Sequence, residues 1–181
     1  HIVGLMGGGE IAVESAEGKG SRFSFELVLE RCAGTAVEGD ADSAAGPLFQ
    51  GKRFLVIDDI DINRDIVVAL LDGSGAQIEC GGDGTDAVAL FEASGAGNYD
   101  AIIMDIQMKD MDGYTATREI RAMGRPDSAS VPIIAMSANA HQQDIDEAMQ
   151  AGMTDYIPKP VEYAQMMATL CRALYGHEAL A

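Results

Sequence analysis

The chain is poor in cysteine, in basic residues and in long hydrophobic runs, and each shortage excludes a class of protein. Three cysteines among 181 residues, widely spaced and odd in number, argue against a disulfide framework and fit a reducing compartment. No CxxC pair or Cys/His spacing indicates zinc. Only 12 Lys and Arg residues face 29 Asp and Glu residues, and the net charge of -17 repels nucleic acid and anionic membrane surfaces.

No apolar run is long enough to span a membrane, and no signal peptide is recognisable. The chain opens at His1 in the middle of a pattern, so we expect a piece of a longer protein whose membrane anchor, if there is one, lies elsewhere. We expect the piece itself to be cytoplasmic and to contact neither nucleic acid nor membrane. What the sequence does have is a hydrophobic fraction of 48%, enough for the core of one ordinary domain plus extra material.

Three stretches of different character divide the chain. Residues 1–30 hold two alternating runs around the turn-forming Glu17–Gly20, which predicts a β-hairpin. Residues 31–50 are rich in Ala, Gly, Asp and Ser and predict a flexible linker. From residue 51 to residue 178, apolar runs alternate with amphipathic stretches. This pattern predicts an α/β fold, a doubly wound five-stranded parallel sheet flanked by five helices.

The predicted helices have recognisable limits. The first carries Ile62, Ile66 and Leu70 at four-residue spacing and ends before Gly73. The second follows Thr85, a candidate N-cap. A third is expected to start after Asp112-Gly113 and to stop at Gly124, and two more at residues 142–151 and 161–176, each followed or ended by a glycine.

Polar residues stand where four apolar runs end. The runs finish at Asp58-Asp59, at Asp105, at Ser137 and just before Lys159. Each run predicts a buried strand, and the carboxyl ends of parallel strands meet at one edge of a sheet. Three acids, one hydroxyl and one ammonium at that edge predict a magnesium-dependent acceptor for a phosphoryl group.

The acidic pair has an alternative interpretation, because Asp58, Asp59 and Asp61 can also cap the following helix. The third acid, Asp105, favours a metal site, since a divalent cation relieves the repulsion among neighbouring carboxylates. Asp105 is then the candidate nucleophile that forms an acyl phosphate. Ser137 and Lys159, the latter before a proline whose peptide bond can be cis, are the candidate donors to the phosphate oxygens.

On these motifs, residues 51–178 resemble a response-regulator receiver domain. The matching segments are Val56–Asp59, Met104–Met108, Met111–Gly113, Pro132–Asn139 and Ala151–Pro160. The resemblance implies the flavodoxin-like receiver fold and phosphorelay signalling: acceptance of a phosphoryl group from phosphohistidine, conformational switching and onward transfer.

The resemblance also implies a role for each matching residue. Asp105 would accept the phosphoryl group. Asp59 would bind Mg²⁺ directly and Asp58 through water, with the backbone carbonyl of Gln107 as a further ligand and Mn²⁺ as an alternative ion. Ser137 and Lys159 would bind the phosphate oxygens.

Tyr156 would be the aromatic switch residue, and Gln107 and Asn139 would tune the lifetime of the acyl phosphate. Two positions depart from the family pattern. Ile60 stands where the family often has Asn, and Lys109 stands where it usually has Pro. Neither departure removes a reacting group, but Lys109 adds a positive charge to the phosphorylated loop.

Residues 1–30 resemble the C-terminal end of a histidine-kinase ATP-binding domain. Its ATP lid and its phosphorylated-histidine helix are absent. The order of kinase end, linker and receiver is that of hybrid sensor histidine kinases, in which this piece would act as phosphoacceptor. The implied partners are the phosphohistidine domain of the parent or of a cognate kinase, and a histidine phosphotransfer protein.

Two other functions fit the predicted fold less well. A non-phosphorylated interaction module would lack one of the acids or the lysine, and none is missing. A haloacid-dehalogenase-type phosphatase needs a second acid two residues after its nucleophile, where this chain has Gln107.

Overall fold

The computed structural model describes residues 12–16, 20–24, 48–138 and 142–176. Contacts within the chain separate two units, residues 1–44 and 45–181. The first unit contains the antiparallel strand pair β1 (Ala12–Ala16) and β2 (Gly20–Ser24), as the hairpin prediction required. Within the described residues, no helix is both long and apolar enough to cross a membrane.

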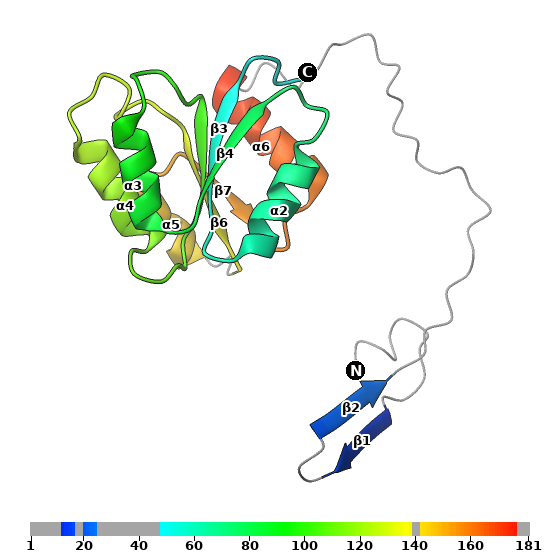
Figure 1. Ribbon diagram of the computed structural model, residues 1–181. Helices are drawn as coiled ribbons and strands as arrows, with labels where there is room; N and C mark the ends of the chain where they lie inside the picture. The colour runs from blue at the N-terminus through cyan, green and yellow to red at the C-terminus, as the bar shows by residue number, and fades with distance from the viewer. Residues whose placement is uncertain (1–11, 17–19, 25–47, 139–141, 177–181) are drawn as a thin grey trace. The chain divides into compact units, whose positions relative to one another are not determined.

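The second unit is a three-layer α/β sandwich built from strictly alternating strands and helices (Figure 1). Its elements are β3 (Arg53–Ile57), α2 (Asp61–Leu70), β4 (Gln77–Gly81), α3 (Gly84–Ala93), β5 (Ala101–Asp105), α4 (Gly113–Ala122), β6 (Ile133–Ser137), α5 (Gln142–Ala151), β7 (Asp155–Pro158) and α6 (Tyr163–Tyr175). All strands are parallel in the order β4-β3-β5-β6-β7, which confirms the predicted doubly wound sheet.

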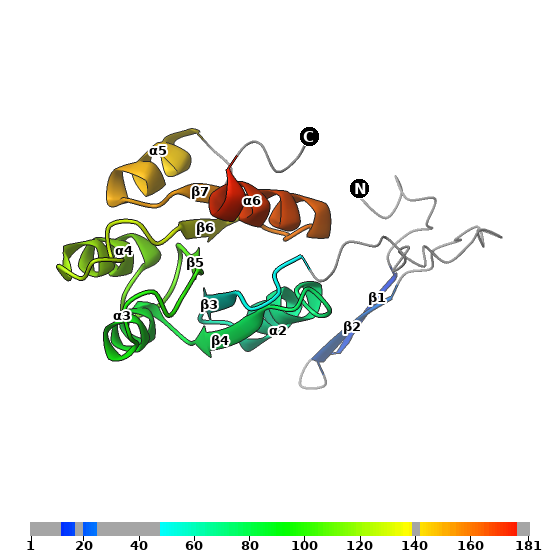
Figure 2. The ribbon, with the colours of Figure 1, turned by 90° about the horizontal axis from the view of Figure 1, so that it is seen from above.

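The sheet separates two hydrophobic cores. Because successive side chains of a strand point to opposite faces, Phe54 and Val56 of β3 enter one core and Leu55 and Ile57 enter the other. Helices α2 and α6 cover the first face, and α3, α4 and α5 cover the second (Figure 2). Because helices cover both faces of the sheet, the five-residue strands β5 and β6 are buried along their full length.

Two helices differ in detail from the prediction. Helix α2 lies where expected, but it packs through Val67 and Leu71, while Ile62 and Ile66 are 61% and 45% exposed. The face of α2 that packs on the sheet is therefore narrower than the spacing of its apolar residues suggested. Helix α3 is capped by Asp83, whose carboxylate accepts the Asp86 N–H at 2.9 Å, and Thr85 lies inside the helix.

The packed unit begins two residues before the predicted start at residue 51. Phe49 is completely buried, packs edge-on against Phe54 with ring centroids 5.3 Å apart, and donates its N–H to the Ser74 carbonyl at 2.8 Å. At the other end of the unit, the Tyr175 hydroxyl donates to the Leu48 carbonyl at 3.2 Å. The first and last turns of this unit are therefore joined.

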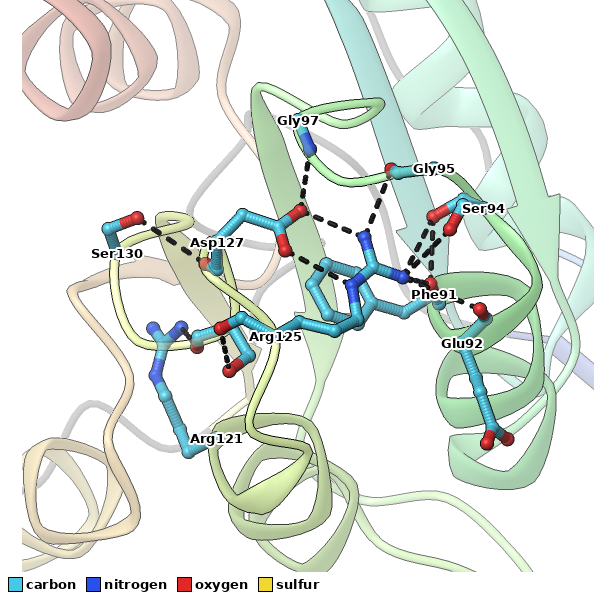
Figure 3. Close-up of polar contacts among 10 residues, drawn as sticks. Phe91, Glu92, Ser94, Gly95, Gly97, Arg121, Arg125, Asp127 and Ser130 are labelled. Atoms are coloured by element: carbon cyan, nitrogen blue, oxygen red, sulfur yellow. Dashed lines mark hydrogen bonds and ion pairs between the residues drawn. The ribbon is translucent and has the colours of Figure 1, made fainter.

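A polar cluster around Arg125 ties together the loops before β5 and β6 (Figure 3). The guanidinium donates to the carbonyls of Phe91, Ser94 and Gly95, and pairs with the Asp127 carboxylate at 2.9 Å. It also lies 4.1 Å above the Phe91 ring. One side chain thus holds two loops that are about thirty residues apart.

Candidate functional site

Asp58, at the end of β3, is completely buried and fully hydrogen-bonded. One carboxylate oxygen accepts the Ile60 N–H at 3.0 Å and the Asn63 side-chain amide at 2.9 Å. The other oxygen accepts the Lys159 ammonium at 2.6 Å. A buried charge is tolerated when it is paired in this way, so Asp58 has a fixed orientation before any ion binds.

Asp105, at the end of β5, shares the same ammonium. Its carboxylate lies 2.9 Å from the Lys159 Nζ, and its side chain is only 6% exposed. Burial raises the pKa of Asp105, and the hydrogen bond and charge of Lys159 only partly oppose this effect. Burial also acts to lower the pKa of Lys159, but its hydrogen bonds to Asp58 and Asp105 outweigh burial and leave that pKa raised.

Asp59 completes a group of three carboxylates. Asp58, Asp59 and Asp105 each offer an oxygen, and these oxygens lie within 4.8 Å of one another. Among the described residues, Lys159 alone contributes an ammonium that pairs with this group. Three carboxylates around one cation leave a local excess of negative charge, and such a set of hard oxygen donors fits Mg²⁺ or Mn²⁺.

The loop from β5 to α4 approaches Asp105 so closely that it requires a glycine. A Cβ on Gly113 would lie 2.2 Å from the Asp105 carbonyl oxygen. The Gly113 N–H donates to the Ile106 carbonyl at 3.0 Å, and Asp112 caps α4 by accepting the Thr115 N–H at 2.7 Å. The Asp-Gly pair of the sequence therefore fixes both the start of α4 and the position of Asp105.

Ser137, at the end of β6, is 3% exposed and is linked to the last strand. Its carbonyl accepts the Lys159 N–H at 2.8 Å and the Tyr156 hydroxyl at 3.2 Å. Tyr156 is half-buried, and burial raises its pKa. The Lys159-Pro160 peptide bond is cis, the form that the sequence allowed for.

A cavity of about 570 Å³ opens beside these residues, and Asp59, Gln107, Lys109 and Ser137 line it. The Lys109 N–H donates to the Asp59 carboxylate at 3.3 Å, while the Gln107 side chain is exposed. The structure thus brings together seven of the eight predicted site residues on one edge of the sheet. The eighth, Asn139, lies outside the described residues, and the individual roles of all eight stay predictions.

Two residues of α2 belong to the site although the sequence analysis did not identify them. Asn63 holds the Asp58 carboxylate, and the Arg64 guanidinium donates to the Asp58 carbonyl and pairs with Asp61. Their position in the first turn after an acidic pair was the available signal. The N-cap residue Ile60 makes no side-chain cap hydrogen bond, but the Asp58 carboxylate accepts the Ile60 N–H at the start of this helix.

Known proteins are similar to this chain in sequence. The chain is 33% identical over 154 residues to a probable histidine kinase 3 of Oryza sativa, a match that covers 76% of this chain and 15% of that protein. It is 39% identical over 115 residues to the hybrid signal transduction histidine kinase L of Dictyostelium discoideum, which covers 63% of this chain and 7% of that protein. The chain therefore spans only a small part of these relatives.

Among solved structures, the receiver domain of a sensor histidine kinase from Pseudomonas aeruginosa is 40% identical, with a TM-score of 0.61 over 68% of this chain and 98% of that one. That structure holds a magnesium ion in its active-site cleft. A chemotaxis protein of Vibrio cholerae has a TM-score of 0.62 at 25% identity, over 68% of this chain and 98% of that one. The family model of the response regulator receiver domain matches residues 54–171 of this chain. The chain therefore belongs to the response regulator receiver family, the phosphorelay domains of two-component signalling.

Proposed function

We propose that Asp105 accepts a phosphoryl group from a phosphohistidine. The observation that carries this proposal is the position of the Lys159 Nζ, 2.6 Å from Asp58 and 2.9 Å from Asp105. A carboxylate that is buried and paired with an ammonium, next to the cavity that Asp59 and Ser137 line, has the setting of an activated nucleophile. In the reaction the Asp105 oxygen bonds to phosphorus, the nitrogen–phosphorus bond breaks, and the imidazole leaves with the electron pair.

The three carboxylates would hold Mg²⁺, with the Gln107 backbone carbonyl as a further ligand. When bound, the ion supplies positive charge that offsets the charge of the phosphoryl group. Lys159 would donate to one phosphate oxygen and the Ser137 hydroxyl to another. Since Lys159 already bridges Asp58 and Asp105, its ammonium needs little movement to follow the new negative charge.

Movement of Ser137 toward the phosphoryl group would convert the modification into a change of surface. Ser137 and Tyr156 are hydrogen-bonded, so a displacement of the β6 end would also move the aromatic ring. The surface around α5 and β7 would then exist in two arrangements, of which phosphorylation favours one.

A phosphohistidine domain or a histidine phosphotransfer protein would dock beside α2. Ile60, the N-cap residue, and Ile62 and Ile66 within the helix are 52%, 61% and 45% exposed. Ile66 also helps to line a second cavity, of about 240 Å³, together with Asp58 and Pro160. An apolar patch next to the acceptor suits a partner that must bring its histidine to Asp105. The surface around α5 and β7 is the other candidate.

The wider context is also a proposal. The hairpin of β1 and β2 would be the end of a kinase ATP-binding domain, and the parent would be a hybrid sensor histidine kinase. Its receiver would work in the cytoplasm, where the thiols of Cys80 and Cys171, which form no disulfide, would stay reduced.

Mass spectrometry after incubation with acetyl phosphate tests the acceptor. We expect one added phosphoryl group with Mg²⁺, none without it, and none in Asp105→Asn. Asp100→Asn is the matched control, since Asp100 pairs with Lys52 at the opposite edge of the sheet. No phosphoryl group on the natural sequence, together with no binding of beryllofluoride, would favour the non-phosphorylated interaction module.

A further inference from the structure

Two tyrosine hydroxyls hold the chain on either side of the segment between β6 and α5. The Tyr156 hydroxyl donates to the Ser137 carbonyl, where β6 ends, and the Tyr114 hydroxyl donates to the Asp144 carbonyl in the first turn of α5. Both contacts measure 3.2 Å. Tyr114 comes from α4, so its hydrogen bond joins the helix that follows the phosphorylated loop to the helix that follows Ser137.

The surroundings of Tyr114 keep its hydroxyl protonated. The ring is half-buried and packs against the core beneath α3, α4 and α5, as does Tyr156. Burial raises the pKa of Tyr114, and the carboxylates of Glu147, Asp144 and Asp112 raise it further. A neutral phenol is a hydrogen-bond donor, which is what the Asp144 carbonyl requires. Tyr114 also lines the 570 Å³ cavity that Ser137 and Asp59 share.

We propose that Tyr114 is a positioning residue that holds α5 in its unphosphorylated place and so sets how readily the site accepts a phosphoryl group. This inference rests on the proposed function. Ser137 and Asp144 are seven positions apart in the sequence. A shift of α5 that accompanies the movement of Ser137 toward a phosphoryl group on Asp105 would have to break the Tyr114 hydrogen bond. That bond stabilises the unphosphorylated arrangement and opposes the switch.

The test compares the affinity for beryllofluoride, a phosphoryl mimic, between the full chain and its Tyr114→Phe variant in saturating Mg²⁺. The substitution keeps the ring in its packing and removes only the hydroxyl. We expect beryllofluoride to bind about three- to tenfold more tightly, the effect of one hydrogen bond that only one state makes. The affinity for Mg²⁺ alone should not change. Tyr163→Phe, at an exposed position at the start of α6, is the matched control and should leave both affinities unchanged.

Three outcomes would overturn the inference. They are an unchanged beryllofluoride affinity in Tyr114→Phe, a weaker one, or a change in Mg²⁺ affinity of equal size, which a general disturbance of the site would cause. If the natural sequence itself fails to bind beryllofluoride, the proposed function falls first. If it binds and Tyr114→Phe binds equally well, the proposed function stands and Tyr114 has no positioning role.

Discussion

The two edges of the sheet, at the amino and carboxyl ends of its strands, each centre on one half-buried cation, and they use it in opposite ways. At the amino edge, Arg125 shares its charge with a single carboxylate, Asp127, and gives its other donors to backbone carbonyls. At the carboxyl edge, Lys159 lies between Asp58 and Asp105, with Asp59 beside them. The first edge is electrically balanced, whereas the second keeps an excess of negative charge.

The difference shows how one fold separates stability from chemistry. A planar guanidinium with five donors is suited to a fixed set of acceptors, which is how Arg125 joins two loops. An ammonium on a flexible stem is a point charge that can move between partners, and the three carboxylates leave room for a second cation. Arg125 therefore serves the folded state, whereas the proposed function assigns Lys159 a part in a change of state.

The largest expected effect is on the stability of the fold, through the Arg125 cluster at the amino edge. Arg125→Met leaves Asp127 and several carbonyls without their partner, so we expect the free energy of unfolding to fall by about 3 kcal/mol. Urea unfolding followed by circular dichroism measures this loss. Arg118→Met, on the exposed face of α4, is the control and should cost little. If Arg125→Met also abolished phosphorylation of the fraction that remains folded, the division between the edges would be wrong.

At the carboxyl edge, Asn63→Ala should weaken Mg²⁺ binding about tenfold, because Asp58 loses the amide that orients it. Isothermal titration calorimetry gives the dissociation constant. Asn98→Ala, in the loop before β5, makes the same chemical change at the amino edge and should leave Mg²⁺ affinity unaltered. Equal affinities in both variants would mean that Asn63 does not position the metal site.

Lys109→Gln should slow phosphorylation by acetyl phosphate about three- to tenfold, since a positive charge at the cavity rim attracts the anionic donor. No ion pair engages the Lys109 ammonium anywhere in the described residues. The rate should recover in Lys109→Arg and should depend less on salt in the glutamine variant. Lys52→Gln removes the same charge at the amino edge, and a similar slowing there would point to net charge alone.

The smallest expected effect is a pH dependence of folding stability that arises at the amino edge. Burial, together with the hydrogen bond to Glu79 at 2.7 Å, raises the pKa of Tyr99 from 10.0 to about 12. The unfolded chain therefore loses this proton before the folded protein does, and stability should fall as the pH rises from about 10 to 12. Tyrosinate absorbance should lose its latest-titrating component in Tyr99→Phe. Ionisation of Tyr99 near pH 10 would contradict the burial argument.

Much of this arrangement was predictable from the sequence because the parallel topology of the sheet determines which residues meet at the site. Apolar runs mark the strands, and the ends of those strands carry Asp58, Asp105, Ser137 and Lys159 to one edge. The limits of α5 agree with the prediction, and α4 begins at Gly113, one residue before the predicted start. These features depend on local spacing and on one general rule of sheet assembly.

The remaining features depend on the reach of long polar side chains. Nothing periodic in the sequence connects Arg125 with the carbonyls of Ser94 and Gly95, or Tyr114 with that of Asp144. A backbone carbonyl has no residue-specific signature, so its partner is known only once the fold is built. The outward position of Ile62 was equally hidden, because an exposed apolar residue gives the same sequence pattern as one that faces the core.

The burial of Phe49 and the contact between Tyr175 and Leu48 have a consequence for how this unit is used in longer chains. Both ends of the unit are anchored away from the acceptor, since the chain enters β3 at the amino edge. Neighbouring domains can therefore be joined at either end without crowding the cavity beside Asp105. The unit can therefore be attached to different neighbouring domains while the site at the carboxyl edge of the sheet stays accessible.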